Sequence, residues 1–224
     1  TSVQRTTAIR SLIDQLKTMP RDKSPEEIYQ QVLRAFPELD YSTSPTPGKK
    51  DHVLRVYMAF SRLVQQDYEY FWDTLNPALR RQLTLADKER YFADLEKLFT
   101  IYQQATPAQQ DQLWLALVLH DVGYTKPVEA FDHPQIGAEM TSPILTQTLL
   151  STETVNVVTE LVRRHVDFGS VGLGEKVSRV LDTPLRPFLL LMGSMDTAGY
   201  VDVTGYIAGV ENRLTPAVLS TFLK

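Results

Sequence analysis

The sequence predicts an all-α fold, and three observations lead to that class. Helix-start signals recur along the chain, and apolar residues repeat at the three- and four-residue spacing of a helix face. Alternation of apolar and polar residues with a period of two is nearly absent, and residues 200–203 are the best strand candidate. We therefore expect helices packed on helices around one core.

The first helix signal precedes a stretch with the composition of a connection. Ser24 and Pro25 suit the N-cap and the first position of a helix, and apolar residues follow at helical spacing. Residues 41–50 (YSTSPTPGKK) hold two prolines, a glycine and small polar residues, which is typical of a loop. We therefore predict an N-terminal helical appendage over 1–46 and a larger helical domain over 47–224.

Further helices are predicted after this connection. A helix face starts at His52 and continues through Val53, Val56 and Phe60. Thr84 with Asp87 three residues later predicts the start of another helix, and Thr106 with Pro107 predicts a third, which carries the apolar residues 113–119. We interpret residues 65–112 as a helical insertion that could serve as a lid or as a partner-binding surface.

Composition limits the function classes. The 224 residues are 43% apolar, enough for one sizeable core, and a net charge of -4 gives no broad basic surface for polymeric nucleic acid. No apolar run reaches the roughly 18 residues of a membrane span, so we expect a cytoplasmic protein without a membrane partner. With no cysteine, any metal must be bound by nitrogen and oxygen ligands. Assembly into a homo-oligomer is left open.

The four histidines of the chain lie in unusual contexts. His120 ends an apolar helical run, His165 continues the apolar face of residues 155–162, and Asp196 extends the face of residues 189–192. One such residue alone is usually a hydrogen-bonded core residue, but an ionised carboxylate is costly to bury without a partner. With Asp121 included, several inward-facing His and Asp residues share one simple explanation, which is metal binding.

Five short segments that contain the His and Asp residues follow one another in a fixed order. They are 52–55 (HVLR), 119–123 (LHDVG), 133–139 (HPQIGAE), 161–165 (LVRRH) and 195–196 (MD). In this order they resemble the signature of HD-domain phosphohydrolases. The resemblance covers about residues 50 to 200, and the spacing of the middle segments is similar to that in HD domains of uridylyl-removing enzymes and of some CCA-adding enzymes. The fold that the resemblance implies is the HD-type helical bundle.

The resemblance also implies a ligand set. Four residues match the set that holds one divalent metal in the superfamily, and His133 with His165 match the pair added in two-metal members. Asp121 would then bridge two ions, and the metal could be iron, manganese, cobalt, nickel or magnesium. The four residues of the first set are His52, His120, Asp121 and Asp196.

The expected chemistry is hydrolysis of a phosphoester or phosphoanhydride in a nucleotide or related small molecule, by metal-activated water. Asp121, Arg55 and Lys126 are the candidate catalytic residues, since Arg55 lies one helical turn after His52 and Lys126 lies near Asp121. The same ligand types also resemble diiron HD oxygenases, which cleave C–C or C–P bonds. A third hypothesis is a non-catalytic, metal-containing binding module. Arg164 and the lack of a Gly-Tyr-Pro segment disfavour a cyclic-dinucleotide phosphodiesterase.

Overall fold

The fold is all α, as predicted. The computed structural model describes residues 1–129, 132–168, 183–200 and 213–224, and these contain helices and no strand. The strand candidate lies outside the described residues except for Tyr200, which is in no regular element. The α-helices are α1 (Ser2–Lys17), α2 (Pro25–Ala35), α3 (Lys49–Val64), α4 (Tyr68–Asp73), α5 (Pro77–Arg80), α6 (Leu85–Gln104), α7 (Pro107–Leu119), α8 (His133–Thr146), α9 (Thr152–Arg164), α11 (Arg186–Gly199) and α12 (Pro216–Phe222). Short 3-10 helices are η1 (Pro37–Leu39), η2 (Tyr41–Thr43), η3 (Val122–Thr125) and η4 (His165–Phe168).

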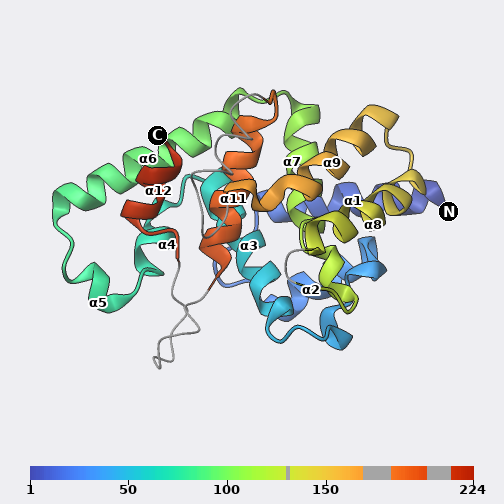
Figure 1. The fold of residues 1–224 in the computed structure, drawn as a ribbon, viewed down its shortest axis with the longest axis horizontal. Coiled ribbons are helices and arrows are strands. Elements are labelled where there is room, and N and C mark those ends of the chain that lie inside the picture. The colour runs from blue at the N-terminus through green and yellow to red at the C-terminus, as the bar shows by residue number, and fades with distance from the viewer. Residues whose placement is uncertain (130–131, 169–182, 201–212) are drawn as a thin grey trace.

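The helices pack around a centre formed by α3, α7 and α11. Helix α11 lies against α3, α7 lies against α9, and α9 in turn packs on α8. At one end of the molecule α12 packs on α6, and at the other end lie α8, α9 and the N-terminal half of α1 (Figure 1). The site described below is built where α3, α7, α8, α9 and α11 meet.

Apolar side chains from both sides of residue 46 belong to one core. Ile9 of α1 and Ile28 of α2 are buried in the same cluster as Phe60 of α3 and Trp114 of α7. Tyr57 joins α3 to α7 directly, because its hydroxyl donates to the Val118 carbonyl at 2.8 Å. The apolar core therefore continues across the predicted boundary, and the division into an appendage and a domain stays a prediction.

Several helix starts agree with the sequence signals. The Thr84 and Thr106 side chains each accept a hydrogen bond from the backbone N–H three residues later. In both cases the side chain at that later position accepts a hydrogen bond from the backbone N–H of the threonine. Helix α2 begins at Pro25 with Ser24 at its N-cap, as predicted, although the Ser24 side chain makes no capping hydrogen bond. Proline at the first position, which needs no donor there, suits this start without the serine.

The predicted connection is shorter than its composition suggests. Residues 41–43 form η2, and α3 begins at Lys49, immediately after Gly48 with its left-handed φ of 76°. A glycine adopts this φ without strain, so the chain can turn sharply into the helix. Segment 65–112, interpreted above as an insertion, contains α4, α5, all of α6 and the start of α7, and its role as a lid or partner surface stays a prediction. None of the described helices is long and apolar enough to cross a membrane.

Candidate metal centre

Six polar side chains meet inside the helical core. Helix α7 is buried all round from Gln112 to Leu119, so the two residues that follow it, His120 and Asp121, start out in the interior. The others come from α3, from the first residue of α8, from the residue after α9 and from α11. Each of the six residues is at most 5% exposed. The six are His52, His120, Asp121, His133, His165 and Asp196.

Glycines allow the close approaches that bring these side chains together. A Cβ on Gly123 would overlap the His133 carbonyl, so η3 reaches the start of α8 only because this residue has no side chain. A Cβ on Gly199 would overlap Val56 and would lie 3.2 Å from the His52 carbonyl oxygen. Residues 123 and 199 therefore set how closely η3 approaches α8 and how closely α11 approaches α3.

The ligand atoms form two groups of three. In the first group, the Asp196 Oδ1 atom lies 2.9 Å from His52 Nε2 and 3.5 Å from His120 Nε2. In the second group, the Nε2 atoms of His133 and His165 are 3.1 Å apart. His52 and Asp196 thus converge although 144 positions separate them.

Asp121 connects the two groups, because its two oxygens face different histidines. Oδ2 lies 3.5 Å from His52 Nε2 and 3.6 Å from His120 Nε2. Oδ1 lies 3.3 Å from His133 Nε2 and 3.6 Å from His165 Nε2. One carboxylate can therefore place one oxygen on each of two neighbouring cations, which is the arrangement of a bridging ligand.

The hydrogen bonds of two imidazoles fix which ring nitrogen faces the centre as an acceptor. Nδ1 of His120 donates to the Leu117 carbonyl at 2.7 Å, and Nδ1 of His165 donates to the Val162 carbonyl at 2.7 Å. In the neutral rings Nε2 then carries the lone pair. His120 Nε2 is buried without a hydrogen-bond partner among the described residues and faces carboxylate oxygens instead. Lone pairs directed at anionic oxygens repel, and a cation between them removes the repulsion.

The separations between ligand atoms fit metal coordination. Two ligands at about 2.0–2.2 Å from one ion, separated by about 90–109°, stand roughly 2.9 to 3.5 Å apart. The observed nitrogen–oxygen and nitrogen–nitrogen separations run from 2.9 to 3.6 Å. These two buried groups could therefore each hold a metal ion, and four imidazoles with two carboxylates suit a divalent transition metal.

The electrostatics of the centre keep both carboxylates ionised. Burial alone raises the pKa of Asp121, but contacts with His120, His133 and His165, where these rings carry a second proton, and with Lys49 outweigh burial and hold this pKa well below its ordinary value. Burial likewise opposes ionisation of Asp196, and contacts with His120 and His52 hold its pKa well below the ordinary range. Two anionic ligands are thus in place before any ion binds.

Sequence reasoning missed three residues of this site. Lys49 Nζ lies 3.0 Å from Asp121 Oδ2 and 3.8 Å from the centroid of the Tyr124 ring. The Tyr124 ring stacks on His133, and the Tyr200 ring packs on His52, each at 4.2 Å between centroids. Burial raises the pKa of Tyr124 to about 12, so its hydroxyl stays protonated at neutral pH. The only sequence signal for Lys49 is its position one helical turn before His52.

Two of the candidate catalytic residues are not among the six side chains of the centre. Arg55 donates from Nε to the Gly199 carbonyl at 2.8 Å and lines a cavity of about 370 Å³ together with Ile28 and Met58. Lys126 is exposed at the end of η3. The structure thus gives Arg55 a contact that joins α3 to the end of α11, and a catalytic role for Arg55 or Lys126 stays a prediction.

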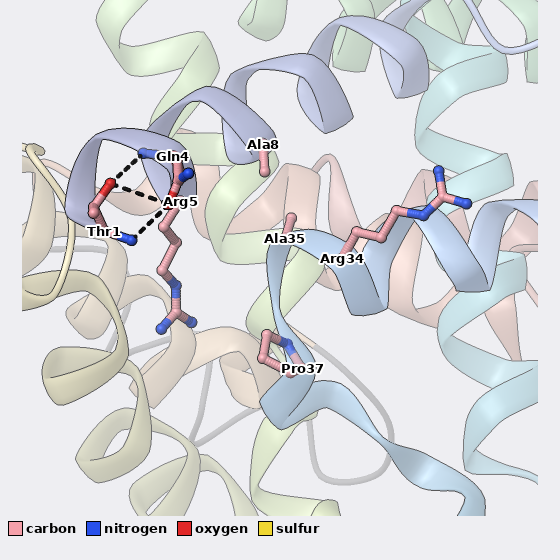
Figure 2. A pocket seen from close by; sticks show the side chains of 7 residues that line it. All are labelled: Thr1, Gln4, Arg5, Ala8, Arg34, Ala35 and Pro37. Atoms are coloured by element: carbon pink, nitrogen blue, oxygen red, sulfur yellow. Dashed lines mark hydrogen bonds between the residues drawn. The ribbon is translucent and has the colours of Figure 1, made fainter.

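A second cavity lies between α1 and α2, away from the six residues. It has a volume of about 370 Å³, and Figure 2 shows its lining, with Arg5 extending from α1 and Arg34 from α2. The Arg5 guanidinium already pairs with Glu38 at 2.6 Å and with Gln147 at 3.1 Å. The charge of Arg5 is therefore balanced within the protein.

Comparisons with protein-family models, curated protein sequences and solved structures give no match to this chain.

Proposed function

We propose that this protein is a metal-dependent phosphohydrolase of the HD superfamily, with two divalent ions held by the six buried residues. The observation that carries the proposal is that the two oxygens of the Asp121 carboxylate face different pairs of histidines. One of its oxygens faces His52 and His120, and the other faces His133 and His165. A single structural ion would need no ligand that bridges two positions. In the two-metal sites of phosphatases the ions lie roughly 3.5–4 Å apart, which is close enough for one carboxylate to bind both.

The protein's own residues would prepare the reaction. The Leu117 and Val162 carbonyls fix the rings of His120 and His165 through Nδ1, so Nε2 is presented as a ligand. The low exposure of the ligands keeps bulk water away and strengthens each charge interaction. Divalent ions bound there would lower the pKa of water toward about 7 and stabilise the charge on a phosphoryl oxygen.

The substrate we propose is a phosphoester or phosphoanhydride in a nucleotide or a related small molecule. The chain carries a net charge of -4 and lacks the broad basic surface that polymeric nucleic acid requires, so a small anion drawn to a local positive site fits better. A cytoplasmic location belongs to the same proposal and stays a prediction.

Metal analysis coupled to activity screening tests this function. We expect elemental analysis to give about two transition-metal ions per chain, and turnover of phosphoesters with at least one of manganese, iron, cobalt, nickel or magnesium. The matched control is Asp51→Asn, which removes an exposed carboxylate next to His52 and should leave both properties unchanged. Absence of bound metal after loading with each ion would contradict the proposal.

The same donors support a second candidate, a diiron oxygenase. The specific observation is the set of nitrogen and oxygen ligands, with Asp121 placed so that it could bridge two ions, which also suits iron. Bound iron with oxygen consumption and no phosphate release would favour it over hydrolysis. Retained metal without turnover of any kind would instead favour a non-catalytic binding module.

A further inference from the structure

Lys49 is the one ammonium group buried against the metal ligands in the described part of the chain. The residue is 7% exposed, and its Nζ contacts the same Asp121 oxygen that faces His52 and His120. An ammonium group has three donors. Among the described residues, Asp121 is its hydrogen-bond acceptor, so donors remain for an anion that reaches the centre.

Two tyrosines hold the Lys49 ammonium in place. Its Nζ lies 3.8 Å from the Tyr124 ring centroid and 5.6 Å from that of Tyr200, both within the range of cation–π attraction. These rings in turn pack on His133 and His52, one histidine from each group. The ammonium therefore lies beside Asp121 and next to rings that pack on both groups of ligands, so an anion held by ions in both groups would lie close to it.

The charges of this centre favour a highly charged anion. Two buried carboxylates and the Lys49 ammonium leave one formal negative charge at the centre, so two divalent ions would produce a formal surplus of three positive charges there. In a buried site such a surplus is costly unless an anion balances it. A phosphomonoester, with a second pKa near 6, carries about two negative charges at neutral pH, whereas a diester carries one.

We propose that Lys49 binds the phosphoryl group of the substrate and makes the site selective for terminal phosphates, which are dianions, over phosphodiesters. This inference rests on the proposed two-metal function and narrows its substrate class. Lys49 acts as a specificity residue through one charge-assisted hydrogen bond and through its charge. The contact with the Asp121 carboxylate keeps the ammonium close to the metal ligands and uses one of its three donors, so the others can bind the phosphoryl group.

The test measures anion binding to the metal-loaded protein by calorimetry at about pH 8, where a phosphate with a second pKa near 6 to 7 is mainly a dianion. The probes are inorganic phosphate and dimethyl phosphate, and manganese content is measured on the same samples. We expect inorganic phosphate to bind at least about tenfold more tightly than dimethyl phosphate. Lys49→Met should weaken phosphate binding by about ten- to hundredfold, the range for one charge-assisted hydrogen bond, and should weaken dimethyl phosphate binding less.

Lys50→Met is the matched control on the next residue of the same helix. Lys50 pairs with Glu26 at the surface, so its loss should change neither metal content nor anion binding. Equal affinity of the unmodified protein for the two probes overturns the inference without any variant. It is also overturned if metal-loaded Lys49→Met keeps the wild-type phosphate affinity, because Lys49 then only balances the charge of Asp121. Phosphate selectivity that depends on Lys49, without hydrolysis of any phosphoester, would uphold this inference and contradict the hydrolase proposal.

Discussion

Gly199→Ala tests whether the close approach of α11 to α3 builds the metal centre. A Cβ at residue 199 would overlap the Val56 side chain and would lie 3.1 Å from the Val56 backbone nitrogen and 3.2 Å from the His52 carbonyl oxygen. Val56 is fully buried and β-branched, so its side chain has little freedom to move away. Even if it rotates, the backbone contacts are short of the usual separation of about 3.5–4.0 Å.

The two helices must therefore separate by roughly 0.5 Å at this point. The His52–Asp196 contact, now 2.9 Å, would lengthen by a similar amount because these residues lie on the two helices that are pushed apart. Overpacking of this kind costs about 1–3 kcal/mol. Replacing a helical glycine by alanine gains at most about 1 kcal/mol, and less at a helix end. We expect net destabilisation of about 1–2 kcal/mol.

Two assays check this expectation. Urea denaturation of the metal-free protein gives the change in the free energy of unfolding, and calorimetric titration gives metal affinity, which should fall for the group containing His52 and Asp196. Gly137→Ala is the control, because its nearest foreign atom is the Val162 Cγ1 at 3.3 Å and the neighbour can yield slightly. A Gly199→Ala protein with unchanged stability and unchanged metal affinity would refute the reasoning.

Three further predictions follow from the same contacts. Asp121→Asn should lose both ions and all turnover, because an amide supplies no anionic oxygen to either group. Elemental analysis should show the loss of metal, and circular dichroism should show that the helices are retained. Full metal content in this variant would exclude Asp121 as a bridging ligand. His133→Ala and His165→Ala should each lower the metal content from about two ions per chain to about one, with loss of activity. A stoichiometry of one ion per chain in the unmodified protein would refute the dinuclear site. Tyr57→Phe removes the hydrogen bond to the Val118 carbonyl, so the free energy of unfolding measured in urea should fall by about 0.5–1.5 kcal/mol while metal binding persists. An unchanged free energy of unfolding would show that this hydrogen bond does not stabilise the fold.

The sequence determined the fold class and much of the helix layout. The starts of α6 and α7 were readable because a threonine cap and its partner three residues later are local signals. The inward direction of His120 and His165 was readable because each follows a buried helical face. Ser24 shows the limit of such signals, since the residue stands at the N-cap and yet makes no capping bond.

Only the tertiary structure decided how these side chains meet. Lys49 and Asp121 are 72 positions apart, and their contact depends on how α3 packs against the end of α7. The contact made by Arg55 likewise depends on packing. Its place on the His52 side of α3 suggested a catalytic role, and in the structure its Nε donates to the Gly199 carbonyl. Helical periodicity fixes the direction of a side chain relative to its own helix, whereas the distance to another helix depends on packing and on glycines such as Gly123 and Gly199.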